Sequence, residues 1–286
     1  MCLDVHPLGP YVQAMNAIVV YESHWGNTAA VARAIAEGIG AGTRALHTEE
    51  ASGSALQGVD LTIEAGERVM IIGRSGAGKT TFLRSINRLV EPTAGTVRVA
   101  GRAVTGAGPG ELRQVRRQIG MIFQQFNLVR RASVLANVLA GRLGYVPVWA
   151  SLAGLFPARD RAIALDCLAQ VGLADFADRR ADTLSGGEQQ RVAIARALAQ
   201  SPSVVLADEP TASLDPQLTG SIMGILKRIN EERGLTLVVS QHQLETALEF
   251  GTRIVGFRSG RVCFDGPPAK VTPAVVEAIY GEEPPA

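Results

Sequence analysis

The sequence lacks the cysteines of a disulfide framework and any uninterrupted hydrophobic run of membrane-spanning length. Its 286 residues include 3 cysteines, none in a paired C-x-x-C spacing, so we expect no disulfide scaffold and no cysteine metal site, but a reducing, cytoplasmic setting. The longest apolar stretch, residues 133–156, is interrupted by Arg142, Gly144 and Pro147, whereas a membrane helix needs about 20 largely apolar residues. The N-terminus also lacks the basic and apolar pattern of a secretion signal.

An excess of charge of either sign is also missing. The chain has 28 Lys and Arg residues against 27 Asp and Glu residues, a formal net charge of +1. Because nucleic-acid-binding surfaces carry a clear positive excess, the sequence predicts no nucleic-acid partner. A hydrophobic content of 47% with 19% charged residues is typical of a globular chain, and the length allows one large α/β domain or two smaller ones.

Hydrophobic patterning predicts an α/β fold with a mainly parallel sheet covered on both faces. Short apolar runs bounded by turn residues indicate strands, and longer periodic runs indicate helices. The expected strands are residues 58–63, 68–73, 95–102, 119–124, 203–210 and 235–240, the expected helices are 79–89 and 216–232, and 253–266 is an expected hairpin that turns at Ser259 and Gly260. Residues 131–180 are helical in character, and Pro147 and Pro157 divide them into pieces. The alternation of strands and helices favours this architecture.

The central motif is a glycine-rich loop that matches G-x-x-x-x-G-K-[ST] without a mismatch. In such a loop backbone N–H groups surround a polyphosphate, Lys79 reaches the β- and γ-phosphates, and the Thr80 hydroxyl binds Mg²⁺. The helix that follows adds its N-terminal dipole. The expected nucleotide-binding residues are Gly73, Arg74, Ser75, Gly76, Ala77, Gly78, Lys79, Thr80 and Thr81.

Two acids follow a second buried strand, in the sequence "SVVLADEP" at 203–210. This is the pattern of a Walker B site. There the first acid, Asp208, holds the Mg²⁺ shell, and the second, Glu209, orients or deprotonates the attacking water.

A third motif, "LSGGEQQRVAIARAL" at 184–198, has both a structural and a functional interpretation. Ser185 followed three residues later by Glu188 predicts a capping box at the start of a helix. A capped helix N-terminus with two glycines also binds anions. The two interpretations are compatible.

Residues 55–281 resemble the ATPase subunit of importers in the ATP-binding cassette (ABC) family, for which LSGGEQQ is the signature motif. The resemblance implies a P-loop NTPase fold with an antiparallel β subdomain and a helical subdomain at about residues 125–183. It also implies catalytic roles for Glu209, His242 and Gln124. The implied cofactors are ATP and Mg²⁺, with Thr80, Gln124 and Asp208 as the expected Mg²⁺ residues.

The resemblance further implies a homodimer in which two cassettes pack head to tail. ATP held by Lys79 of one cassette would be closed over by the signature residues of the other, and Asp215 would lie at the interface between them. The expected signature residues are Ser185, Gly186, Gly187 and Glu188. ATP would join the dimer and hydrolysis would release it, which makes a two-state switch controlled by the γ-phosphate.

Three segments, 126–144, 155–165 and 261–281, resemble phosphonate importers in particular. Such a subunit lies peripherally on the cytoplasmic face of the cell membrane. It works with transmembrane permease subunits, and a periplasmic or lipoprotein substrate-binding protein acts through the permease. The apolar stretch 133–156 would then belong to the helical subdomain that receives the permease, and a partner would cover its exposed apolar residues.

The N-terminal part differs from the ABC pattern. Residues 1–16 form a tail, and residues 17–52 resemble the first β-α-β unit of flavodoxins, in which a Ser-x-x-Gly-Asn-Thr loop binds the phosphate of FMN. Ser23, Gly26 and Asn27, with the threonine that follows them, match that loop. The rest of a flavodoxin does not follow, so FMN binding is not expected.

In the family, adenine stacks on an aromatic residue near the start of the cassette. Residues 47–54 occupy that place here and contain no Tyr, Phe or Trp. Stacking a base is worth about 1–3 kcal/mol, so its loss predicts ATP binding weakened by about 5- to 150-fold. A defective hybrid cassette with weak ATP binding is therefore the alternative to a working importer ATPase. Two other classes are a soluble ABC ATPase of DNA repair or translation and a flavin-binding redox module. The single cassette argues against the first, and the short flavodoxin-like segment argues against the second.

Overall fold

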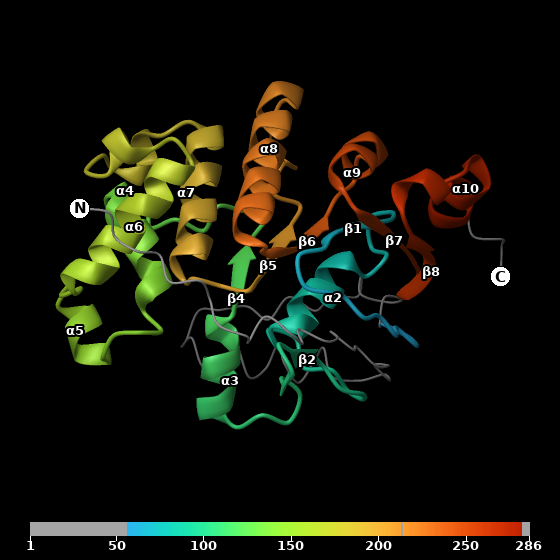
Figure 1. Cartoon of the computed structure of the whole chain (residues 1–286), viewed down its shortest axis with the longest axis horizontal. Coiled ribbons are helices and arrows are strands. Elements are labelled where there is room, and N and C mark those ends of the chain that lie inside the picture. Colours follow the sequence, from blue (N-terminus) through green and yellow to red (C-terminus); the bar gives the residue numbers. More distant parts are fainter. Residues whose placement is uncertain (1–55, 213, 282–286) are drawn as a thin grey trace, which may run out of the picture.

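The computed structural model describes residues 56–212 and 214–281, in which strands and helices alternate along the chain (Figure 1). The expected tail, the flavodoxin-like unit at 17–52 and the segment at 47–54 lie outside the described residues. The strands are β1 (Arg68–Ile72), β2 (Arg98–Val99), β3 (Arg102–Ala103), β4 (Ile119–Ile122), β5 (Val204–Asp208), β6 (Thr236–Ser240), β7 (Arg253–Arg258) and β8 (Arg261–Gly266). The helices are α2 (Lys79–Ile86), α3 (Pro109–Arg117), α4 (Val134–Leu139), α5 (Val148–Leu152), α6 (Ala158–Gln170), α7 (Gly186–Ala199), α8 (Pro216–Arg233), α9 (Leu244–Phe250) and α10 (Pro273–Tyr280).

The main sheet has six strands in the order β4-β5-β6-β1-β7-β8. The first five are parallel, and β8 pairs antiparallel with β7 through the turn at Ser259 and Gly260, which adopt φ of 47° and 77°. The predicted mainly parallel sheet and the predicted hairpin are therefore confirmed. β5 and β6 are buried along their whole length, which is why they read as continuous apolar runs.

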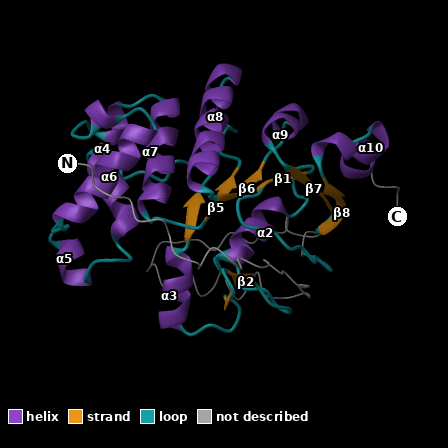
Figure 2. Ribbon diagram, in the orientation of Figure 1, coloured by secondary structure: helices purple, strands orange, loops and turns teal. Residues whose placement is uncertain are grey.

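Two hydrophobic cores cover the two faces of the sheet, and neighbouring residues of one strand belong to different cores. Met70 of β1 belongs to the buried cluster that contains residues of α4, α6, α7 and α8, whereas Val69 belongs to the cluster that contains residues of α2 and α3. Figure 2 shows the same arrangement, with α8 and α9 on one side of the strands and α2 and α3 on the other. This division follows from the two-residue repeat of side-chain direction in a strand.

The segment from α4 to α7 is helical, as the sequence predicts. Pro147 is the N-cap of α5 and Pro157 is the N-cap of α6, because proline is tolerated at a helix start but not in its interior. α4, α6 and α7 pack on one another beside the edge strand β4. Within residues 56–212 and 214–281, no helix is long and apolar enough to cross a membrane.

Three sequence expectations differ from the structure. The expected single strand at 95–102 is instead the two-residue strand β2 followed by a turn at Ala100 and Gly101, whose φ values of 50° and 73° reverse the chain into the antiparallel β3. Residues 58–63 form no strand, although Val59, Leu61 and Ile63 are buried in the alternating manner of one. A strand requires a hydrogen-bonded neighbour, and alternation alone does not supply it. The helix that begins at Lys79 ends at Ile86 rather than near residue 89, because Arg88 adopts a φ of 56° that no α-helix continues.

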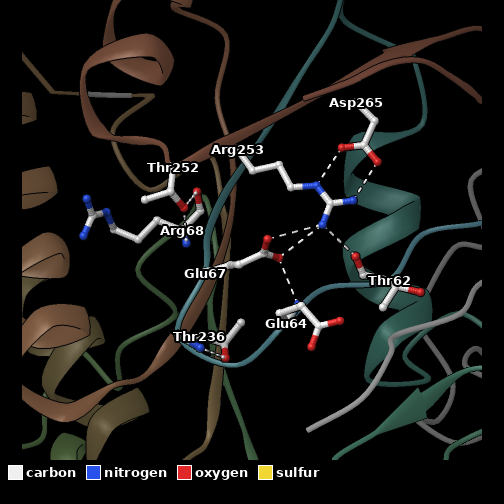
Figure 3. A network of polar contacts seen from close by, with 9 residues as sticks. Thr62, Glu64, Glu67, Arg68, Thr236, Thr252, Arg253 and Asp265 are labelled. Atoms are coloured by element: carbon white, nitrogen blue, oxygen red, sulfur yellow. Dashed lines mark hydrogen bonds and ion pairs between the residues drawn. The ribbon is translucent and has the colours of Figure 1, made fainter. Parts of the chain in front are cut away.

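A polar network fixes the segment before β1 at the amino edge of the sheet (Figure 3). The Arg253 guanidinium donates to both carboxylate oxygens of Asp265 at 2.6 Å, to the Thr62 carbonyl oxygen at 2.8 Å and to Glu67 at 3.2 Å. The hydrogen bonds that it donates to Asp265 raise the pKa of this guanidinium further. Since Glu67 directly precedes β1, these contacts join the start of β1 to β7 and β8.

Candidate functional site

The glycine-rich loop connects β1 to α2 at the carboxyl edge of the sheet. Gly73 has a φ of 150°, and a Cβ at this position would lie 2.3 Å from the carbonyl oxygen of Phe257, so only glycine fits against β7. Gly78 is the N-cap of α2 with a φ of 100° and has no capping side chain. Among the described residues the start of α2 is therefore left for an anion to cap.

Lys79 lies under the loop with only 4% of its side chain exposed. Its ammonium group donates to the carbonyl oxygens of Gly73 at 2.8 Å and Arg74 at 3.1 Å, and it lies 3.9 Å from Glu209 Oε1. Burial lowers the pKa of Lys79, while the charges of Glu209 and Asp208 act in the opposite direction. The loop thus holds the Lys79 ammonium at its centre. There the ammonium faces the carbonyl oxygens of the loop and the carboxylate of Glu209.

Asp208 ends β5 and is almost completely buried. Its Oδ1 accepts hydrogen bonds from the Thr80 hydroxyl at 2.9 Å and from the Ser240 hydroxyl at 3.0 Å. The first bond joins the start of α2 to the end of β5 across 128 residues of sequence. The structure therefore brings the two predicted residues Thr80 and Asp208 together.

Glu209 follows directly and has a φ of 46°, a left-handed conformation that costs a non-glycine residue about 1–2 kcal/mol. Its backbone N–H donates to Ser240 Oγ at 2.9 Å, and its Oε1 lies 2.5 Å from His242 Nε2. Side chains held in strained backbone conformations concentrate at functional sites. Glu209 combines this backbone conformation with the side-chain contact to His242.

The predicted capping box at the start of α7 is confirmed. Ser185 is the N-cap, its Oγ accepts from the Glu188 backbone N–H, and Glu188 Oε2 accepts from the Ser185 N–H at 2.8 Å. These bonds to Ser185 lower the pKa of the Glu188 carboxyl. Gly187 packs against Leu218 of α8, where a Cβ would lie 3.0 Å from the leucine Cδ2.

Several other predicted site residues that the structure describes do not contact the cluster of Lys79, Thr80, Asp208, Glu209 and His242. Gln124 is exposed two residues beyond β4, and in the described part of the chain no hydrogen bond joins it to Asp208 or Thr80. Asp215 is the N-cap of α8, where its Oδ1 accepts from the Leu218 N–H at 2.9 Å. Likewise, within the described residues the hydrogen bonds of Lys79 and Ser185 do not connect the two side chains. In the loop itself, Arg74, Ser75 and Gly76 are exposed, Ala77 is buried and Thr81 is half-buried.

Three buried polar residues of the site were missed by reasoning from the sequence. Ser240 joins both acids at the end of β5, and Gln241 hydrogen-bonds to Thr211. The only sequence signal was their position at the end of an apolar strand, where polar residues of parallel sheets gather. That position does not reveal which residues on other strands they meet.

The oxygen donors of the cluster fit Mg²⁺ bound together with a polyphosphate. Mg²⁺ usually takes one or two protein ligands and completes its shell with phosphate oxygens and water. Thr80 and Asp208 supply a hydroxyl and a carboxylate of this kind at 2.9 Å from each other. In residues 56–212 and 214–281 no group of three or more His, Cys, Asp or Glu side chains could hold a metal ion, so the donor set does not resemble an all-protein metal cage.

A backbone cradle for phosphate, a buried cation within it and carboxylates facing both are what nucleoside triphosphate hydrolysis requires. The α/β fold that carries them is that of a P-loop NTPase. A profile of the ABC transporter family matches residues 56–212, more than half of the chain. The chain belongs to the ABC transporter family, as an ATP-binding cassette.

Relatives and solved structures agree with this assignment. The chain is 52% identical over 228 residues to the phosphonates import ATP-binding protein PhnC of Staphylococcus haemolyticus, covering 80% of this chain and 89% of the relative. It is 50% identical over 226 residues to the protein of the same name from Staphylococcus epidermidis, covering 79% and 88%.

Among solved structures, the dimeric bacterial ABC transporter cassette MJ0796 has a TM-score of 0.66 at 40% identity, with 74% of this chain and 90% of that chain covered. CbiO1 of Clostridium perfringens, part of the ABC transporter complex CbiONQ, has a TM-score of 0.68 at 28% identity, with 77% and 85% covered.

Proposed function

We propose that the chain is the ATP-hydrolysing subunit of an importer that takes up phosphonates or a related oxyanion through a separate permease. The observation that carries this proposal is the 52% identity over 80% of the chain to a phosphonate import ATP-binding protein. The polar cluster around Lys79 supports the enzymatic half of the proposal. The proposed cassette comprises residues 55–281, with its helical subdomain at about 125–183.

The glycine-rich loop would bind the phosphates of ATP. Its backbone N–H groups and the start of α2 offer donors, and the Lys79 ammonium would turn from the Gly73 and Arg74 carbonyl oxygens to the β- and γ-phosphates. Thr80 and Asp208 would hold Mg²⁺, with Gln124 reaching it from the end of β4. Bound Mg²⁺ supplies positive charge beside the phosphates.

Glu209 would orient the attacking water and accept its proton. The side chain is 11% exposed, so most bulk water is kept from it, and its contact with His242 fixes one carboxylate oxygen. The other oxygen is left to face a water molecule. His242, which is 42% exposed, would contact the γ-phosphate and thereby report its presence to Glu209.

A homodimer would complete each site. In the described chain the signature residues at the start of α7 make no contact with Lys79, and ATP bound to one subunit would meet Ser185 and Gly187 of the other. The related cassette MJ0796 has been solved as a dimer in two structures, one of them in a post-hydrolysis state bound to ADP and phosphate. Asp215, at the start of α8, would contact the partner cassette.

Replacing Ser185 with alanine should reduce both stability and hydrolysis. Loss of the cap should cost about 1 kcal/mol of unfolding free energy. Loss of a hydrogen bond to phosphate in the dimer should lower hydrolysis by about 10- to 150-fold. Denaturant unfolding and a phosphate-release assay measure the two effects.

The matched control is Ser133→Ala, because Ser133 caps α4 with an equivalent hydrogen bond from the Ala136 N–H at 3.1 Å. This variant should lose similar stability and keep its hydrolysis. Equal hydrolysis by the two variants would contradict the proposed role of Ser185.

The permease would dock on the helical side of the molecule. Large apolar side chains are exposed on and beside α5, with Trp149 69% and Val148 65% exposed. A monomer rarely leaves such residues together without a partner. The chain would thus lie peripherally on the cytoplasmic face of the membrane, with the substrate-binding protein acting through the permease.

The test is deletion of the gene in the host, followed by growth with methylphosphonate or phosphate as the only phosphorus source. Growth should fail on the phosphonate alone, and the wild-type gene should restore it whereas a Glu209→Gln gene should not. The tagged chain should also copurify from solubilised membranes with a permease. Undiminished growth of the deletion strain on phosphonates would contradict the proposed transport role.

A further inference from the structure

We propose that Gln241 is a positioning residue that ties the loop carrying His242 to the loop carrying Asp215. The inference deepens the proposed ATPase function and rests on it. It assigns a role to a buried amide that lies between the site of hydrolysis and the surface proposed to meet the second cassette.

Gln241 uses both ends of its side-chain amide. The residue directly follows β6 and is 3% exposed. Its Nε2 donates to Thr211 Oγ1 at 3.1 Å, and its Oε1 accepts from the backbone N–H of His242 at 3.0 Å. Because a backbone N–H can only donate, the oxygen must face His242 and the nitrogen must face Thr211. The amide therefore has one orientation.

The two partners belong to loops that the proposed function uses. Thr211 lies two residues after Glu209, is 6% exposed, and its carbonyl oxygen accepts from the Leu214 N–H at 3.1 Å. Leu214 is next to Asp215, the N-cap of α8. One buried hydrogen bond therefore links the backbone that bears His242 with the turn that leads to Asp215.

The anchor of this link is rigid. The Gln241 backbone N–H donates to the Ile71 carbonyl oxygen at 2.9 Å in β1, and the preceding residue, Ser240, holds both Asp208 and Glu209. Breaking a buried hydrogen bond leaves a polar group unsatisfied, which makes intermediate positions of the two loops costly. A shift of Asp215 on dimer formation would therefore move His242 relative to Glu209 rather than be absorbed locally.

The consequence concerns turnover more than binding. Neither amide end of Gln241 points to the glycine-rich loop, so loss of the link should leave ATP affinity in place. What should suffer is the alignment of His242 with Glu209, whose side chains meet at 2.5 Å. The link would allow each site to hydrolyse ATP efficiently only when the interface turn is in its dimer position.

The experiment compares steady-state ATP hydrolysis of the full-length chain with that of Gln241→Leu, Thr211→Val, their double variant and Thr211→Ser. The two single apolar variants should lower kcat by about tenfold with KM for ATP within about twofold of wild type. The double variant should be no worse than either single variant, because all three lose one shared link. Thr211→Ser keeps the hydroxyl and should restore kcat. Thermal unfolding of each variant identifies any that lose kcat by misfolding.

Wild-type kcat in both apolar variants would overturn the positioning role. So would additive losses in the double variant, or a loss in Thr211→Ser as large as in Thr211→Val, since both would indicate packing rather than the hydrogen bond. These outcomes leave the proposed function intact if the wild-type chain hydrolyses ATP. A wild-type chain that binds Mg-ATP without hydrolysing it would overturn the proposed function and this role with it.

Discussion

Replacing Glu209 with glutamine should lower ATP hydrolysis by about 10²- to 10⁴-fold, the usual contribution of a general base, while ATP binding persists. Glutamine matches glutamate in size and can still contact His242, so the geometry at the end of β5 should survive. It cannot accept a proton from water. The substitution also removes a negative charge 3.9 Å from the Lys79 ammonium, which favours retention of the triphosphate.

The second expected consequence is an ATP-bound dimer that accumulates because its release depends on hydrolysis. Size-exclusion chromatography with light scattering, in the presence of Mg-ATP, measures it. The control is Glu231→Gln, which changes an exposed glutamate of α8 that pairs with Arg68 far from the cluster. Normal turnover by the Glu209→Gln protein would contradict the assigned role.

Replacing Lys79 with alanine should abolish useful nucleotide binding. The ammonium is buried at the glycine-rich loop, whereas the other cation of the loop, Arg74, is exposed. Hydrogen bonds to charged groups are worth about 1.5–3 kcal/mol each. Loss of two such bonds to phosphate corresponds to about 10²- to 10⁴-fold weaker affinity. The carbonyl oxygens of Gly73 and Arg74 would lose the same donor, so the empty loop should also become less ordered.

Thermal unfolding with and without Mg-ATP measures the effect. A ligand at 100 times its Kd stabilises a native protein by about 2.7 kcal/mol. The wild-type melting temperature should therefore rise with ATP, and that of Lys79→Ala should not.

The matched control is Lys270→Ala, because Lys270 is another of the few lysines in the chain and is exposed. It should keep the full rise in melting temperature. A full rise in Lys79→Ala would contradict the binding role, and no rise in the wild-type chain would favour the defective hybrid.

Much of the fold could be predicted because its elements depend on nearby residues. The capping box of Ser185 and Glu188, the turn at Ser259 and Gly260, and the helix starts at Pro147 and Pro157 each follow from interactions within four residues. The glycine-rich loop could likewise be predicted from the sequence, because its backbone geometry requires glycine at fixed spacings.

The amino-acid sequence by itself thus determined the strands of the main sheet and the helices α2, α7 and α8, and that a phosphate-binding loop and an acidic strand end are both present. Only the tertiary structure decided that Asp208 would meet Thr80, that Glu209 would meet His242, and that Ser240 and Gln241 would fasten them. It also decided against a strand at 58–63. The physical reason is that side-chain direction in a strand follows a two-residue repeat that can be recognised in the sequence. Which residues become neighbours across a sheet depends instead on strand order, and strand order depends on how the two cores pack on the sheet.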